Sequence, residues 1–212
     1  MGTLLRMELR RALGNRFFII ALVIGCVLAV IGAVRPITSY LTARDTVLTE
    51  EYLAYKNTFQ FALTSAWAQW LPLRATDATP NLFFFAAPLL IAFAYSWSYR
   101  SDELGGYAQS VMVRTTRSRY YAAKACATFV AGGLVVAVPL LLNFIVLACF
   151  IPLQPPDIVY KLYTGVSTNI FLSGVFFTNP PLFMAVRFAI DFALAGLWAA
   201  AVLAFSLFVR NR

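Results

Sequence analysis

The stretch "FFIIALVIGCVLAVIGAV", Phe17 to Val34, contains no charged side chain. As an α-helix rising about 1.5 Å per residue, it would extend about 27 Å, close to the thickness of the hydrocarbon core of a bilayer. No small-x-small cleavage site closes the run, so we interpret it as an uncleaved membrane-spanning helix and not as a signal peptide. The run therefore predicts a fold that is decided by a bilayer.

The composition of the whole chain agrees with this prediction. Of its 212 residues, 61% are hydrophobic and 12% are charged, whereas soluble domains have about 45–50% and about 25%. Three further apolar segments could cross a membrane, at about 82–97, 125–150 and 184–209. We expect an all-α fold, a polytopic bundle of membrane helices that forms a single transmembrane domain over residues 1–212.

The first sixteen residues are basic and have helical periodicity. Leu5, Leu9, Ala12 and Leu13 recur at spacings of one helical turn, opposite several arginines. This pattern predicts an amphipathic interfacial helix over residues 3–15. Within the first span, small residues recur every four positions: Ala21, Gly25, Ala29 and Ala33. Such a stripe would let another helix approach closely. Chance recurrence of small residues in an Ala-rich helix is an equal alternative.

The net charge of +8 is concentrated at the ends of the apolar segments. By the positive-inside rule, the amino terminus, the loop 98–124 and the carboxyl end face the cytoplasm, and segments 35–81 and 151–183 are extracytoplasmic. Such a distribution does not form the continuous basic face that nucleic acid requires. We expect the protein in the cytoplasmic (inner) membrane, with these side chains at lipid headgroups or fixing orientation: Arg6, Arg10, Arg11, Arg16, Arg114, Arg117, Arg119 and Lys124.

The residue inventory argues against an enzyme. The chain has no histidine, the commonest general base and metal ligand, and no G-x-x-x-x-G-K-[ST] phosphate loop. Cys26, Cys126 and Cys149 all fall in apolar stretches, where cysteine behaves as a small hydrophobic residue. We expect no catalytic residue, no metal site and no cofactor in this chain.

Two other segments carry patterns of interest. Tyr52, Tyr55, Phe59, Leu63, Trp67 and Trp70 recur at spacings of three or four and predict an aromatic-faced helix at the opposite membrane surface, with a ligand-binding face as the alternative. In the last span, Arg187 and Asp191 stand four residues apart and could pair on one helix face. This intramembrane pair has a structural interpretation and a substrate-path interpretation.

The longest polar run is "SYRSDELGGYAQSVMVRTTRSRYYAAK", Ser98 to Lys124. Its basic second half is suited to anionic headgroups. Its first half offers Ser101 as a helix cap, two acidic residues for the first turn, and two glycines that permit close approach of another backbone. Carboxylates are repelled by an anionic leaflet. This first half is therefore predicted to dock a cytoplasmic protein.

This loop, the basic amino-terminal stretch "LLRMELRRALGNRFF" and the span after the loop resemble the membrane subunits of type-2 ATP-binding-cassette (ABC) transporters over Met1 to about Phe150. The resemblance implies a permease, an exporter, driven by ATP that a separate nucleotide-binding subunit hydrolyses with Mg. It also implies a second permease subunit, in a homo- or heterodimer. The residues matching the ATPase-coupling helix of that family are Asp102, Glu103, Leu104, Gly105, Gly106 and Tyr107.

One feature departs from the family pattern. Members usually have six spans, and we count four in this sequence, with "FSLFVRNR" directly after the last. The expectation is that two carboxyl-terminal spans are missing or that the subunit is reduced. Two other functions stay open: a non-transporting membrane scaffold or immunity protein that recruits a soluble partner, and, more weakly supported, an intramembrane enzyme.

Overall fold

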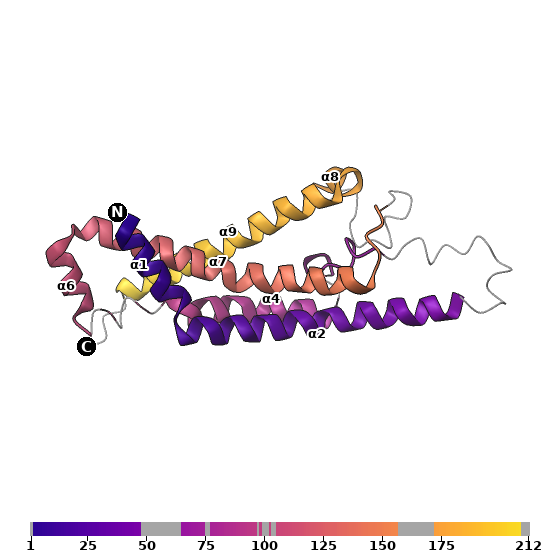
Figure 1. The fold of residues 1–212 in the computed structure, drawn as a ribbon, viewed down its shortest axis with the longest axis horizontal. Helices are drawn as coiled ribbons and strands as arrows, with labels where there is room; N and C mark the ends of the chain where they lie inside the picture. The colour runs from indigo at the N-terminus through magenta and orange to yellow at the C-terminus, as the bar shows by residue number, and fades with distance from the viewer. Residues whose placement is uncertain are drawn as a thin grey trace. The chain divides into compact units, whose positions relative to one another are not determined.

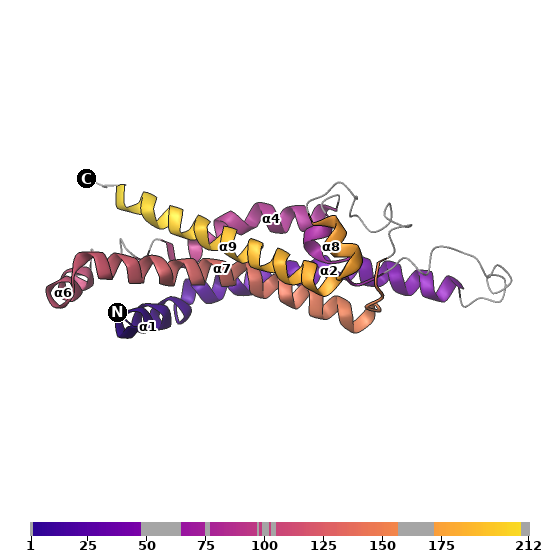
Figure 2. The ribbon, with the colours of Figure 1, turned by 90° about the horizontal axis from the view of Figure 1, so that it is seen from above.

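The computed structural model describes residues 2–47, 65–74, 77–96, 98, 102, 105–156 and 172–208. Within these ranges the protein is helical and has no strand. Figures 1 and 2 show the helices from two directions. In chain order they are α1 (Gly2–Leu13), α2 (Arg16–Val47), the 3-10 turn η1 (Leu71–Leu73), α4 (Ala78–Ile91), the π-helical turn η2 (Ala92–Ser96), α6 (Tyr107–Arg114), α7 (Arg117–Phe150), α8 (Ser173–Thr178) and α9 (Pro180–Phe208).

Four of these segments are long and apolar enough to cross a membrane: Arg16–Asp45, Ala78–Tyr95, Arg117–Phe150 and Pro180–Ser206. They coincide with the four predicted spans, but all four helices begin earlier than the hydropathy alone indicated. The first also continues well past Val34, to Val47. Charged and polar residues thus extend the helices beyond the apolar runs. Among residues 66–70 the structure has turns where an aromatic-faced helix was predicted; the rest of that prediction lies outside the described residues.

The contacts of the chain divide it into two compact units. Unit 1 comprises Met1–Gly25, Phe84–Val138 and Ala189–Arg212, and unit 2 comprises Cys26–Phe83 and Pro139–Phe188. Helices α2, α4, α7 and α9 contribute to both units, so each unit is built from segments that are distant in the sequence.

Unit 1 is packed around glycines. A Cβ added to Gly132 on α7 would lie 2.3 Å from the Ala199 Cβ on α9, and one added to Gly133 would lie 2.5 Å from the Phe192 ring. From the other side, a Cβ on Gly196 would lie 2.7 Å from the Phe129 ring. Only glycine permits so close an approach of two helices. Gly196 is buried on α9, whereas Ala204, two turns later on the same helix, is exposed.

The four-residue stripe of α2 is buried. Ala21, Gly25, Ala29 and Ala33 all lie inside the protein, whereas the opposite face exposes large apolar side chains such as Val23, Val27 and Ile31. In unit 2, Ala33 packs against Leu147 and Ile151 of the α7 end. The close-packing interpretation of this stripe is therefore confirmed.

Pro36 lies inside α2 without ending it. A proline has no N–H, so the carbonyl four residues earlier, that of Gly32, loses its usual helical donor. In unit 2 the Arg74 guanidinium donates to the Gly32 oxygen over 3.1 Å. This arginine is itself paired with Asp77, to which Arg35 also donates, over 3.2 Å. The Arg74 side chain thus replaces the backbone donor that Pro36 cannot supply, and the helix continues through the proline.

The second proline-linked irregularity lies in unit 1. Five residues, Ala92–Ser96, form a π turn after α4, and in a π turn the N–H groups bond to carbonyls five residues earlier instead of four. The carbonyl of Pro88 accepts a hydrogen bond from the Trp198 indole N–H over 3.3 Å. Tyr95 of this turn and Ser98, two residues after it, line a polar pocket of unit 1.

Candidate functional site

Four charged side chains of unit 1 gather from three parts of the chain. We call this group the charge cluster: Glu8 and Arg11 of α1, Asp102 of the loop before α6, and Lys124 of α7. Glu8 is 0% exposed, Lys124 1% and Asp102 5%. Buried charges are costly unless they are paired and hydrogen-bonded. The two acids and two bases compensate each other in formal charge.

Asp102 is the acceptor for three donors. Arg11 Nη2 donates to its Oδ1 over 2.8 Å, the Tyr120 hydroxyl donates to its Oδ2 over 3.3 Å, and the Lys124 ammonium donates to the same oxygen. The side chain therefore joins the loop to α1 on one side and to α7 on the other.

Glu8 is the second acceptor of the cluster. The hydroxyl groups of Tyr95 and Tyr107 donate to its carboxylate over 3.3 and 3.2 Å, and the Arg11 and Lys124 cations each approach to 3.4 Å. It is buried because the face of α1 that packs inward is Leu4, Glu8 and Ala12, at four-residue steps. The predicted stripe of Leu5, Leu9 and Leu13 is adjacent to this face, and Leu5 is exposed.

The surroundings raise the pKa values of Arg11 and of the neighbouring Tyr107, both of which are partly exposed at the edge of the cluster. Burial by itself would lower the pKa of Arg11, but its hydrogen bond and ion pair with Asp102 outweigh this and raise the pKa above its ordinary value. Burial raises the pKa of Tyr107, and the Glu8 carboxylate raises it further. The Arg11 guanidinium also lies 3.9 Å from the centroid of the Tyr107 ring. Arg11 is therefore a permanent cation that holds α1 to the loop.

The structure distributes the predicted headgroup residues between two environments. Arg6, Arg10, Arg16, Arg117 and Arg119 are exposed, as headgroup contacts require. Arg11 is partly covered by its ion pairs, and the side chain of Arg114 lies outside the described residues. Lys124 differs from the prediction: it is inside the protein, because two buried carboxylates bind it, and cannot reach a headgroup.

The predicted coupling residues also lie in different environments. Asp102 is buried in the charge cluster, which corrects the expectation of an exposed carboxylate; Glu103 and Leu104 lie outside the described residues. Gly105 is exposed, and Gly106 adopts φ of +70°, a conformation that favours glycine and starts α6. Tyr107 is half-buried against Arg11. On α6 itself, Val113 is 87% exposed.

Arg187 and Asp191 both lie on α9, as predicted. Asp191 is buried and Arg187 is partly exposed. Among the described residues, no group of three or more His, Cys, Asp or Glu side chains could hold a metal ion.

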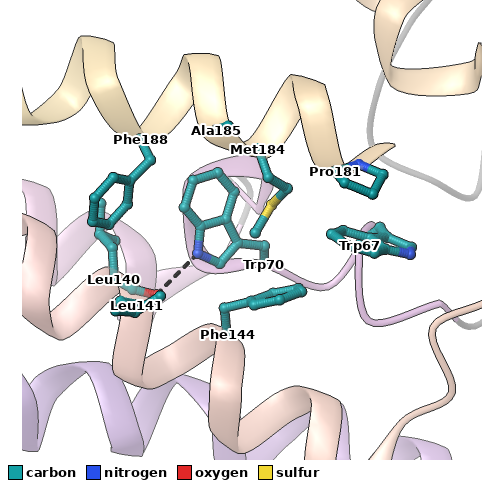
Figure 3. Close-up of a pocket in the computed structure, with 9 residues that line it drawn as sticks. All are labelled: Trp67, Trp70, Leu140, Leu141, Phe144, Pro181, Met184, Ala185 and Phe188. Atoms are coloured by element: carbon teal, nitrogen blue, oxygen red, sulfur yellow. Dashed lines mark hydrogen bonds between the residues drawn. The ribbon is translucent and has the colours of Figure 1, made fainter. Parts of the chain in front are cut away.

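Unit 2 contains an apolar pocket of about 350 Å³ (Figure 3). Figure 3 shows the Trp70 ring beside Met184 of α9, with Phe144 of α7 below them and Trp67 near Pro181. The Trp70 indole N–H already donates to the Leu140 carbonyl over 3.1 Å, so it offers no donor to a ligand. The described residues that line it are Trp67, Trp70, Leu140, Leu141, Phe144, Pro181, Met184, Ala185 and Phe188.

Asn143 holds the segment that carries these tryptophans. It is fully buried in α7, donates to the Ala29 carbonyl of α2 over 2.7 Å, and accepts from the Leu71 N–H over 3.2 Å. The sequence analysis overlooked it, although a single asparagine within "AVPLLLNFIVLACF" was a usable signal, since polar side chains inside apolar helices commonly bond to a neighbouring helix.

The fold defines a class: a helical protein whose four long apolar helices are compatible with a membrane protein. Comparisons of the chain with protein-family models, curated proteins and solved structures find no match.

Proposed function

We propose that this chain is the membrane-spanning permease subunit of an ABC exporter of the type-2 family, resident in the cytoplasmic membrane with its amino terminus in the cytoplasm. ATP and Mg would be bound by a separate nucleotide-binding subunit, and a second permease subunit would complete the substrate path. The resemblance of the loop and of the amino-terminal stretch suggests this proposal. The observation that carries it is α6, a short helix between two long apolar helices that presents a large apolar side chain to solvent.

Val113 is suited to dock a partner. It is 87% exposed on a helix of eight residues, so the part of the chain that the structure describes leaves this side chain largely uncovered. Apolar side chains that anchor a protein interface are exposed in the free protein and buried in the complex. Gln109, one turn earlier, and Ser110 are also exposed and would give the same face a polar rim.

The charge cluster would make α6 an effective transmitter of movement. Asp102 and Tyr107, on the amino-terminal side of α6, bind Arg11 of α1, and Asp102 also binds Lys124, two turns inside α7. A displacement of α6 by a partner would therefore reach a long apolar helix through buried ion pairs instead of a flexible loop. This is the mechanical requirement for coupling ATP hydrolysis to a membrane path.

The test is co-expression with a candidate ABC ATPase, such as one encoded by a neighbouring gene, followed by co-purification and measurement of ATP hydrolysis in lipid. Val113→Asp should weaken the complex at least ~5-fold, since an interface anchor contributes more than about 1 kcal/mol. Thr116→Asp is the matched control: it adds the same charge at an exposed position and keeps a good cap for α7. Glu103→Arg, in the predicted coupling stretch before α6, is a second variant.

The proposal is wrong if Val113→Asp and Glu103→Arg both leave complex formation and hydrolysis at the level of Thr116→Asp. A partner that binds through α6 without any stimulated hydrolysis would instead indicate the scaffold or immunity function.

A further inference from the structure

Unit 1 contains a polar pocket of about 310 Å³ beside the charge cluster. Its lining comes from the junction of α1 and α2, from the π turn and from the loop that follows it: Arg10, Arg11, Gly14, Asn15, Tyr95, Ser98 and Asp102. Unlike the pocket of unit 2, it is rich in hydrogen-bond donors. Its chemistry is independent of the transporter proposal.

Ser98 is the residue that points to a ligand. It lines the pocket and is only 6% exposed, yet its hydroxyl oxygen forms no hydrogen bond within 3.5 Å among the described residues; only a weaker interaction with Tyr95, which lines the same pocket, is open to it. An unsatisfied buried hydroxyl costs about 1–3 kcal/mol. A bound group with acceptor oxygens would remove this cost.

The other donors indicate that the missing group is an anion. Arg10 is exposed at the pocket and forms no ion pair with the described acidic residues. The Asn15 oxygen already accepts from the Phe17 N–H over 3.1 Å, which leaves its NH2 group as a donor. The amino-terminal end of α2 follows directly, with Arg16 and no acidic residue in its first turn, so the helix dipole adds positive potential.

Among the described residues of the lining, Asp102 is the one carboxylate, and its charge is not available to repel an anion. Arg11 binds it over 2.8 Å, and Lys124 binds it from the other side. The positive charge of Arg10 therefore remains uncompensated at the pocket, together with the neutral donors of Ser98 and Asn15.

We propose that this pocket binds a phosphate group, that of an anionic lipid headgroup. Arg10 would form a charge-assisted pair with the phosphate oxygens, and Ser98 and Asn15 would donate to them. The pocket lies where two apolar segments end, because α2 begins at Arg16 and the segment Ala78–Tyr95 ends at Tyr95. In a bilayer this is the depth of the headgroups.

The test uses purified protein in a neutral detergent and three probes: dioctanoyl phosphatidic acid, dioctanoylglycerol and inorganic phosphate. Binding is measured by tryptophan fluorescence and by the shift of the thermal unfolding midpoint. We expect saturable binding of the phosphatidic acid and none of the dioctanoylglycerol. Arg10→Gln should weaken binding about 10-fold or more, and Ser98→Ala about fivefold. Arg6→Gln, one turn earlier on α1 and outside the pocket, should weaken it less than twofold.

The unliganded variants separate a ligand role from a structural role. Ser98→Ala should leave the unfolding midpoint without lipid unchanged or raise it, since the hydroxyl has no hydrogen bond to lose among the described residues. A clear fall of that midpoint would mean that the hydroxyl is structural. Equal binding by Arg10→Gln and Arg6→Gln, or equal binding of dioctanoylglycerol, would overturn the site. Inorganic phosphate that binds as tightly as the lipid would retain a phosphate site but reject the lipid as its source.

Discussion

Lys124, two turns inside a long apolar helix, donates a hydrogen bond to Asp102 of the loop that precedes α6. Both side chains are buried, and Arg11 approaches the same carboxylate over 2.8 Å. A single acidic residue thus connects the amino-terminal helix, the loop and α7.

Lys124→Met should destabilise the protein by about 3 kcal/mol, because it leaves a buried carboxylate without one of its two cations. Adding Asp102→Asn to that variant should restore much of the loss, since both members of the pair are then neutral. Unfolding in mixed micelles of increasing dodecyl sulfate content measures the change. Arg119→Met, which removes an exposed cation of the same helix, should alter stability by less than about 0.5 kcal/mol. Equal losses in the single and double variants would contradict the pairing.

Tyr107 combines a hydrogen bond with a ring contact, and two substitutions separate them. Tyr107→Phe removes only the hydroxyl that donates to Glu8 and should cost about 1 kcal/mol. Tyr107→Leu also removes the ring beside Arg11 and should cost about 0.5–1 kcal/mol more. The same unfolding assay applies, and identical stabilities of the two variants would exclude the ring contact.

The pH dependence of Tyr107 has a defined sign. Burial and then Glu8 raise its pKa in the folded protein above that in the unfolded chain. Its contribution is therefore complete below the ordinary tyrosine pKa of about 10 and is lost as pH rises through the raised value. The difference in stability between the parent and Tyr107→Phe should shrink above that range.

Gly132→Ala tests the contact between α7 and α9 in unit 1. Its new Cβ would lie 2.3 Å from the Ala199 Cβ, and overpacking of this kind costs about 1–3 kcal/mol. A second substitution, Ala199→Gly, should recover part of the loss. Gly174→Ala on α8, where no atom lies within 4 Å of the added carbon, should cause no loss. If Gly132→Ala unfolds at the same dodecyl sulfate content as the parent, the contact is not made.

Asn143→Leu should loosen the attachment of the segment 65–74 to α7 within unit 2. It removes the acceptor of the Leu71 N–H and the donor to Ala29, at a cost of about 1–3 kcal/mol. Hydrogen exchange of the Leu71 amide should accelerate, because its acceptor is lost. Asn81→Leu, at an exposed position of α4, is the control. Unchanged exchange at Leu71 in Asn143→Leu would contradict the role of this side chain.

The orientation can be tested by labelling cysteines in a variant that lacks Cys26, Cys126 and Cys149. A cysteine at Ser110, exposed on α6, should react with a membrane-impermeant maleimide only from the cytoplasmic side. A cysteine at Ala43, exposed near the end of α2, should react only from outside. The reverse result would overturn the assignment of both loops.

Hydropathy was sufficient to predict the four long helices, because an apolar run long enough to cross a bilayer has few stable structures other than a helix. It could not place their ends. Pro36 and the charged residues after it argued against continuing α2, but Arg74 supplies the donor that the proline lacks. Such compensation comes from a residue about forty positions away and has no local signature in the sequence.

The candidate sites were predictable only in part. The sequence identified Asp102 and Lys124 as notable but assigned them to different partners, a soluble protein and lipid. Their pairing depends on how the loop folds back against α7, and a charge pattern does not encode that geometry. The burial of Glu8 could have been anticipated, since it shares a helix face with Leu4 and Ala12. Ser98 could not, because its importance lies in a missing partner.

Because of the π turn at Ala92–Ser96, the positions of the side chains that follow depend on the number of residues in this segment as much as on their identity. Each residue of an α-helix turns its successors by about 100°. Deleting one residue of the turn would therefore rotate Tyr95 or Ser98, or both, away from the positions from which they line the polar pocket. A one-codon deletion in this segment is expected to harm the protein more than most single substitutions there. Among relatives of this chain, the number of residues between Pro88 and Ser98 should vary less than their identity.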